Sequence, residues 1–214
     1  MDILYQDKNL IFVVKPSGVL SQKDEKGRAN MVDELSVLCK CEVYPVHRLD
    51  MEVGGVMVYA KNAEAAAKMS VITASHENFK KEYLAVVEGF PKESGTFEDL
   101  LYHDKIKNKT YVVKRERKGV KKAKLEYRVV GQITTDEREI SLVKVRLYTG
   151  RTHQIRVQFA SRGFPIVGDR RYGASSGKNI HLFSHKIEFL SPFDKKGMSF
   201  SAEPPKENEW AKFI

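Results

Sequence analysis

The distribution of apolar residues along the chain is the feature that most constrains its fold. Apolar residues fall mainly in runs of strand length, and three stretches have the length and composition of a helix. The predicted helices cover residues 29–39, 63–74 and 153–162. Because strands and helices do not alternate regularly, a repeating βαβ fold is disfavoured. The pattern predicts an α+β fold with a mixed, largely antiparallel central sheet and flanking helices.

The strands of this sheet and the ends of its helices can also be predicted. Predicted strands cover residues 3–5, 10–14, 53–60, 81–88, 110–114, 125–130, 140–148 and 180–189, with a final short run after Gly197. The 81–88 run is apolar on both faces, which indicates a central strand. Asn62 is expected to cap the second helix and Thr152 to cap the third, with Gly163 as the C-terminal stop of the third helix.

Length and composition exclude several classes of protein. A chain of 214 residues suits one domain or two joined halves of about 100 residues each. With 42% hydrophobic residues the chain is not disordered. It has no apolar run of membrane-spanning length and no basic N-terminal region followed by an apolar stretch, so we expect a cytoplasmic protein. Cys39 and Cys41 are too few for a zinc site and the histidines lack ligand spacing, so no metal is expected.

The charge of the chain favours an anionic partner. Lys and Arg number 37 against 28 Asp and Glu, a formal net charge of +9. Residues 105–124 concentrate this excess, with ten Lys or Arg and one acidic residue, Glu116. Charge alone does not choose among RNA, DNA and a membrane surface. The segment could equally be a solvated hairpin tip that binds nothing.

Three segments combine polar residues in unusual ways. His47-Arg48-Leu49-Asp50 stands directly before an apolar strand, where an Arg–Asp pair could simply close a loop. Tyr83 lies within the predicted central strand, as a core tyrosine would. The segment 148–156 turns into a helix start rich in Arg, Thr, His and Gln. Exposed amides there, together with Arg151 and Arg156, would suit an anion.

These segments together resemble the RluA-like pseudouridine synthases. The motifs are VVKPSGVLSQ at 13–22, HRLDMEVGGVMVYAK at 47–61, KKEYLAVVEG at 80–89 and LYTGRTHQIRVQFASRGFPIVGDRRYG at 147–173. The resemblance covers the chain from about residue 3 to residue 192. It implies a single catalytic domain over residues 1–214 with a catalytic cleft. The RNA-binding module that many relatives carry in front of this domain is not expected, because the first family segment begins almost at residue 1.

The resemblance also implies a set of site residues. Asp50 would be the catalytic carboxylate, Tyr83 the residue that stacks on the base, and Arg156 the basic partner of Asp50. The substrate-binding residues would be His47, Arg48, Arg151, Thr152, His153 and Gln154. The implied activity is isomerisation of specific uridines in structured RNA, either rRNA or tRNA, by a monomeric enzyme without cofactor. Whether Asp50 acts as a nucleophile at C1′ or as a base at C2′ stays open.

Two other functions are weighed against this one. The chain could be a catalytically inactive basic RNA-binding or assembly protein on the same fold. The presence of Asp50, Tyr83 and Arg156 together argues against that reading, because a pure binder has no use for a buried carboxylate facing RNA. A phosphate-handling hydrolase built on the helix start at Thr152 would need a G-x-x-x-x-G-K-[ST] loop, which the sequence lacks.

Overall fold

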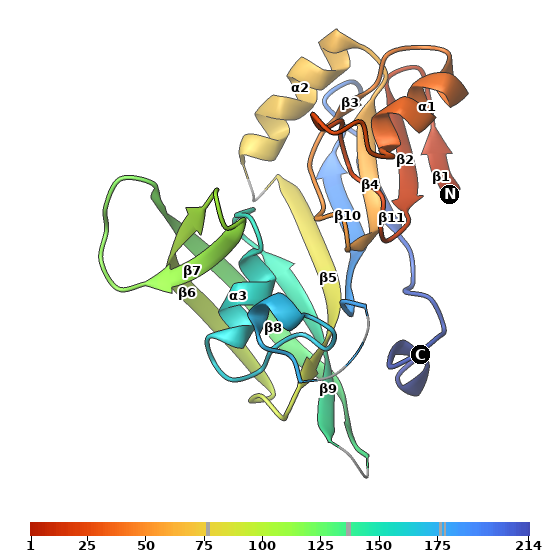
Figure 1. Ribbon diagram of the computed structural model, residues 1–214. Helices are drawn as coiled ribbons and strands as arrows, with labels where there is room; N and C mark the ends of the chain where they lie inside the picture. The colour runs from red at the N-terminus through yellow and green to blue at the C-terminus, as the bar shows by residue number, and fades with distance from the viewer. Residues whose placement is uncertain (76–77, 136–137, 176, 178) are drawn as a thin grey trace. The chain divides into compact units, whose positions relative to one another are not determined.

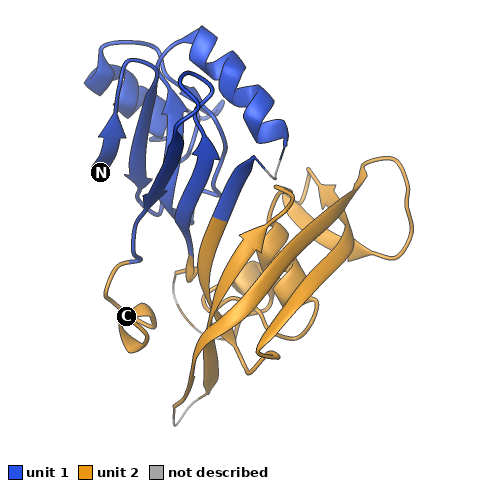
Figure 2. Ribbon diagram, turned by 180° about the vertical axis from the view of Figure 1, so that it is seen from behind, with its two compact units in different colours: residues 1–81, 183–204 blue, residues 82–182, 205–214 orange. Residues whose placement is uncertain are grey.

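The chain divides into two compact units. The computed structural model describes residues 1–75, 78–135, 138–175, 177 and 179–214. Unit 1 comprises residues 1–81 and 183–204, and unit 2 comprises residues 82–182 and 205–214 (Figure 2). The chain passes from one unit to the other within strand β5 (Phe79–Glu88), again at the first residue of β10 (Leu182–Leu190), and a third time between residues 204 and 205.

Unit 1 contains a mixed sheet and two helices (Figure 1). Its strands follow the order β1-β2-β4-β10, with β3 on β4 and β11 on β10. All these pairs are antiparallel except β4 with β10, which is parallel. The further elements are β1 (Asp2–Gln6), β2 (Leu10–Lys15), α1 (Met31–Cys39), β3 (Tyr44–Pro45), β4 (Gly54–Ala60), α2 (Ala63–Ala74) and β11 (Gly197–Ser201).

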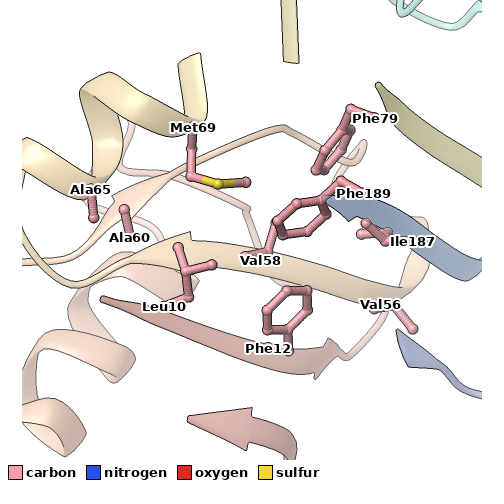
Figure 3. Close-up of a cluster of buried hydrophobic side chains, with 10 residues drawn as sticks. All are labelled: Leu10, Phe12, Val56, Val58, Ala60, Ala65, Met69, Phe79, Ile187 and Phe189. Carbon is pink, nitrogen blue, oxygen red and sulfur yellow. The ribbon is translucent and has the colours of Figure 1, made fainter. Parts of the chain in front are cut away.

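A cluster of apolar side chains between the sheet and α2 forms a core of unit 1 (Figure 3). Strands β2, β4 and β10 and helix α2 all contribute to it. Its members are Leu10, Phe12, Val56, Val58, Ala60, Ala65, Met69, Phe79, Ile187 and Phe189. Every residue of β4 is buried, so this strand anchors the loop that precedes it.

Side-chain caps define the starts of both helices of unit 1. Asn30 Oδ1 accepts the amide of Asp33 at 3.0 Å, and Asn62 Oδ1 accepts the amide of Ala65 at 2.8 Å. Each bond satisfies one of the amides that a helix leaves free in its first turn. The Asn62 cap and the 63–74 helix therefore confirm the sequence-based expectation.

Unit 2 contains a second set of strands with helix α3 on one side (Figure 1). Its order is β5-β9-β8-β6-β7, and the pairs among β6, β7, β8 and β9 are antiparallel. The elements after β5 are β6 (Ser94–Asp104), β7 (Lys109–Val113), β8 (Val120–Thr134), β9 (Glu139–Leu147), α3 (Gln154–Ala160) and the 3₁₀ turns η1 (Arg170–Tyr172) and η2 (Trp210–Lys212). The predicted α+β class and the largely antiparallel strands are confirmed.

Two expectations about unit 2 were wrong. Thr152 does not cap the third helix. The residue before the helix is His153, in a left-handed conformation with φ 53° and no side-chain cap, and the helix spans Gln154–Ala160. The sequence reading also missed β6 entirely and gave β8 less than half its length. In β6 only Phe97 and Leu101 are buried. They are four residues apart, so the run lacks the buried residue at every second position by which a strand is recognised in a sequence.

Within the described part of the chain, no helix is both long and apolar enough to cross a membrane.

Candidate active site

The loop that carries Asp50 is held in place through its backbone. It joins β3 to β4, and residues 16–21, which follow β2, run beside it. Ser21 Oγ donates to the carbonyl of Leu49 at 2.8 Å and accepts the Leu49 amide at 3.0 Å. The amide of Gly18 donates to the carbonyl of Met51 at 2.8 Å. The residues on both sides of Asp50 are therefore fixed, while Asp50 itself stays partly exposed.

A buried lysine completes this attachment. Lys15 is fully buried, and its Nζ donates to the carbonyls of Pro16 at 2.8 Å, Val19 at 2.7 Å and Met51 at 3.1 Å. Three carbonyls satisfy the three N–H groups of an ammonium, which is the form we assign near neutral pH. Burial lowers the pKa of Lys15 to about 8, and the charge of Asp50 opposes that shift. The VVKPSGVLSQ segment thus holds the Asp50 loop and places a cation near its carboxylate.

A close approach of two strands follows the loop. Gly55 has φ 119°, and a Cβ built on it would lie 2.3 Å from the carbonyl oxygen of Ser184 on β10. Any larger residue would force β4 and β10 apart, because that contact is with backbone. Ser184 Oγ also donates to the carbonyl of Val56 at 3.0 Å. Gly55, in the HRLD motif region, therefore allows β4 and β10 to pack closely, and this packing anchors the Asp50 loop.

The other predicted residues of this loop differ in exposure. Arg48 is exposed. Both ring nitrogens of His47 are buried and have no hydrogen-bond partner in the described structure. The ring packs 5.7 Å from that of Phe79. Burial, with the charge of Lys81 nearby, lowers the pKa of His47 to about 3, so the ring is neutral at physiological pH.

Unit 2 carries the remaining predicted residues. Tyr83 is buried in β5, with 6% of its surface exposed. The turn before α3 is organised by Gln154, whose Oε1 accepts from Thr149 Oγ1 at 2.7 Å and from the Arg151 amide at 3.0 Å. Gln154 Nε2 donates to the carbonyl of Lys124 on β8 at 3.1 Å. Gln154 therefore ties this turn to the neighbouring strand.

Two further contacts hold the same turn. Arg151 Nε donates to the carbonyl of Lys122 at 3.0 Å. The carbonyl of Thr152 accepts from Thr110 Oγ1 on β7 at 2.8 Å. The turn is thus attached to both β7 and β8.

Arg156 is buried in a two-point ion pair. Its Nε and one terminal nitrogen lie 2.6 and 2.9 Å from the two oxygens of Asp169. Both side chains are almost fully buried, and the ring of Tyr172 lies 5.3 Å from the guanidinium carbon. The planar fork of arginine matches a carboxylate in this way, whereas lysine would not. Asp169 therefore sets the orientation of Arg156.

Tyr172 links this ion pair to the strands. Its hydroxyl accepts the Thr110 amide at 2.8 Å and lies 2.9 Å from His153 Nδ1. The hydroxyl oxygen can accept from Thr110 and still either donate to or accept from Nδ1 of His153, according to the tautomer of the ring. His153 is thus oriented by Tyr172, which the strand β7 positions in turn.

Asp169 and Tyr172 were missed as site residues, although both lie in the quoted 147–173 motif. A buried arginine needs a carboxylate partner, and Asp169 follows the apolar run Ile166-Val167 closely in the sequence. Gly168, just before it, has φ 83°, and a Cβ there would lie 1.8 Å from the carbonyl oxygen of Asn179. That glycine is a local sign that the backbone at Asp169 is tightly constrained.

No group of three or more His, Cys, Asp or Glu side chains among the described residues could hold a metal ion.

Comparison with known proteins identifies several relatives of this chain. A tRNA pseudouridine synthase C of Haemophilus ducreyi is 34% identical, over 81% of this chain and 74% of its own length. A ribosomal large subunit pseudouridine synthase D of Borreliella burgdorferi is 32% identical, over 97% of this chain and 69% of its own length. An RNA pseudouridine synthase of Aquifex aeolicus, itself uncharacterized, is 32% identical over 96% of this chain and 70% of its own length.

Solved structures and a family profile complete the comparison. The structure of human RNA Pseudouridylate Synthase Domain Containing 4 has a TM-score of 0.78 at 22% identity. It covers 95% of this chain and 88% of that one, which shows the shared fold. The profile of the RNA pseudouridylate synthase family matches residues 9–161, which include the Asp50 loop, β5 and Arg156. The chain therefore belongs to the RNA pseudouridylate synthase family, the enzymes that isomerise uridine to pseudouridine.

Proposed function

We propose that this chain isomerises specific uridines of structured RNA, rRNA or tRNA, to pseudouridine, with Asp50 as the catalytic carboxylate. One observation carries the proposal: Asp50 is the aspartate of the HRLD motif, on a loop whose neighbouring backbone is held by Lys15, Gly18 and Ser21. A partly exposed carboxylate between fixed backbone groups can meet a substrate in one orientation. Such preorganisation is what positions a reacting group for catalysis.

The chemistry is consistent with a single carboxylate. The N1–C1′ bond of uridine breaks, the uracil turns, and a C5–C1′ bond forms, with loss of the proton from C5 and gain of one at N1. No electrons are gained or lost, and the atoms of uridine and pseudouridine are the same, so the reaction itself calls for no redox partner. Asp50 would act as a nucleophile at C1′ or as a base at C2′.

The other residues receive supporting roles in this proposal. Tyr83 would stack on the uracil while it is detached, since a ring face tolerates rotation in its plane. Arg156, oriented by Asp169, would be the basic partner of Asp50. Arg48 and Arg151 would contact the displaced nucleotide and its phosphates, because the target base must leave its stack to react. His47, Thr152, His153 and Gln154 would shape the binding site, Gln154 through the turn that it holds.

Pseudouridine mapping tests the activity. The purified protein is incubated with RNA from cells that lack its gene, and new pseudouridines are mapped with a reagent that marks them and stops reverse transcription. We expect one or a few uridines to be modified by the wild type and by Glu52→Gln, which removes another carboxylate of the same loop. Asp50→Asn should modify none. Equal modification by Asp50→Asn would refute the assignment, and binding without any modification by the wild type would favour the inactive RNA-binding alternative.

A further inference from the structure

The strands of unit 2 have one face that is not covered by α3. The opposite face packs on that helix, where Leu101 and Ala123 meet Val157. Figure 1 shows α3 in front of these strands, and Figure 2, seen from behind, shows the strands in front of it. Residues paired across strands share a face and alternate along each strand. The register therefore defines an outer face that includes Glu98, Leu100, Tyr102, Asp104, Lys109, Tyr111, Val113, Val120, Lys122, Lys124, Glu126, Arg146 and Tyr148.

Each tyrosine of the outer face lies beside a cation. The Arg117 guanidinium lies over the Tyr102 ring at 4.6 Å. Lys109 Nζ lies 5.8 Å from the Tyr111 ring and 5.4 Å from the Tyr172 ring. The Tyr148 ring has the Arg146 guanidinium at 4.8 Å and Lys124 Nζ at 5.7 Å. Tyr111 is 37% exposed. Aromatic rings that alternate with cations on a sheet face are the elements with which proteins stack unpaired bases and hold the phosphates between them.

A groove lies on the same face. Leu100 and Val120 form its apolar part and Glu116, Arg117 and Lys122 its charged part, around a volume of about 460 Å³. Pockets that take small ligands begin at about 300 Å³, so a nucleobase fits this space. A base that entered it would meet the Arg117 guanidinium, which itself covers Tyr102.

The acidic residues near this face are already engaged. Asp104 accepts the backbone amides of Ile106 and Lys107, each at 3.0 Å. Glu98 lies 2.8 Å from Lys124 Nζ, and Glu116 lies 3.6 Å from Lys122 Nζ. Glu126 accepts a hydrogen bond from the Tyr148 hydroxyl at 2.7 Å. These contacts leave Lys109, Arg117 and Arg146 over their rings, so the face keeps an excess of positive charge toward an anionic strand.

We infer that the outer face is a second RNA-binding surface, which stacks unpaired bases of a single-stranded segment that adjoins the target of modification. The inference rests on the proposed function for the presence of RNA, but not on the role of Asp50. The surface contributes affinity and placement and takes no part in bond breaking. A sheet on which the tyrosines and cations merely stabilise one another would show the same contacts without binding RNA.

Binding of a fluorescein-labelled 12-nucleotide oligoadenylate to the whole chain tests the inference. This probe is single-stranded and contains no uridine, so it cannot be a substrate. Tyr102→Ala combined with Tyr111→Ala should weaken binding at least about tenfold, because the stacking ring of Tyr111 is lost and Arg117 loses the ring that supports it. Tyr102→Phe combined with Tyr111→Phe keeps both rings and should bind like the wild type. Equal affinity of the alanine variant and the wild type would overturn the inference.

A charge pair on one strand gives a matched control. Lys122 and Lys121 are both exposed neighbours on β8, but the register puts Lys122 on the outer face and Lys121 on the other. Lys122→Ala should reduce the slope of log affinity against log salt by about 0.7, the value for one phosphate contact with a single strand. Lys121→Ala should leave the slope unchanged. Equal effects of the two substitutions would show that only overall charge matters, and would contradict the inference.

Cross-linking of the unmodified protein needs no variant to fold. Ultraviolet cross-linking to the same oligoadenylate, followed by mass spectrometry, should mark peptides that contain Tyr102, Tyr111 or Tyr148. Cross-links confined to residues 1–81 and 183–204 would overturn the inference.

If the wild type forms pseudouridine while its outer face does not bind the oligoadenylate, the inference fails and the proposed function stands. If the outer face binds but no uridine is modified, the proposed function fails instead.

Discussion

Asp50 and Arg156, the two charged residues with proposed roles in catalysis, are held in different ways. The Asp50 loop in unit 1 is attached through backbone groups, by hydrogen bonds from Lys15, Gly18 and Ser21. Arg156 in unit 2 depends on one side chain, the carboxylate of Asp169, with which it is almost fully buried. Bonds spread over several backbone groups tolerate the loss of any one of them. A buried ion pair does not, because loss of either partner leaves an uncompensated charge.

Arg156→Ala should therefore have the largest effect on stability. It leaves Asp169 buried without its cation, which lowers the free energy of unfolding by about 3–5 kcal/mol. Urea unfolding followed by circular dichroism measures this loss. Arg156→Met combined with Asp169→Leu removes both charges and should recover part of the stability, but no pseudouridine formation. An Arg156→Ala protein as stable as the wild type would remove the contrast between the two regions.

Lys15 gives a smaller effect that depends on pH. Its pKa is about 8 in the folded chain and near 10.5 when unfolded, so between these values the unfolded state binds more protons and stability rises with pH. The shift of about 2.5 pH units corresponds to roughly 3 kcal/mol. The difference in unfolding free energy between wild type and Lys15→Met, measured from pH 7 to 10.5, should increase by one to three kcal/mol. A constant difference would show that burial does not lower the pKa of Lys15 in the folded chain.

Tyr83 should matter for activity more than for stability. Stacking on a base contributes about 1–3 kcal/mol, so Tyr83→Leu should slow single-turnover pseudouridine formation by about 10- to 100-fold. Tyr83→Phe keeps the ring and should stack normally. If the hydroxyl also moves the proton at C5, the phenylalanine variant would cleave the glycosidic bond and then stall, which mass analysis of the RNA would detect. A fully active leucine variant would place Tyr83 outside the site.

Tyr172→Phe should have the smallest effect. It removes the hydroxyl that accepts from the Thr110 amide and shares a hydrogen bond with His153 Nδ1, at a cost of about 1–2 kcal/mol in unfolding free energy. The Arg156–Asp169 pair stays intact, so the rate should fall only a few-fold. A rate loss as large as that of Arg156→Ala would mean that His153, and not the ion pair, is the critical element of this region.

How far the sequence predicted the structure depended on whether the signal was local. Asn62 and the α2 helix were predicted because a cap and an alanine-rich run lie within a few residues of each other. The HRLD and GRTHQIR motifs pointed to Asp50 and Arg156 through family resemblance. The Asp169 partner of Arg156 had no assigned role, because an ion pair between residues 13 apart leaves no periodic pattern. The start of α3 was misplaced because Thr152 is held by β7, a contact that no local rule contains.

One paired measurement tests the account most directly. Single-turnover pseudouridine formation and urea unfolding are measured for Asp50→Asn and Asp169→Asn on the same RNA. Asp50→Asn should lose at least about 10²–10⁴-fold in rate, the usual contribution of a proton-transferring group. Its unfolding free energy should stay within about 0.5 kcal/mol of the wild type. Asp169→Asn should be clearly destabilised, since Arg156 is then buried without a carboxylate. A wild-type rate in Asp50→Asn would contradict the assignment of Asp50 as the catalytic carboxylate.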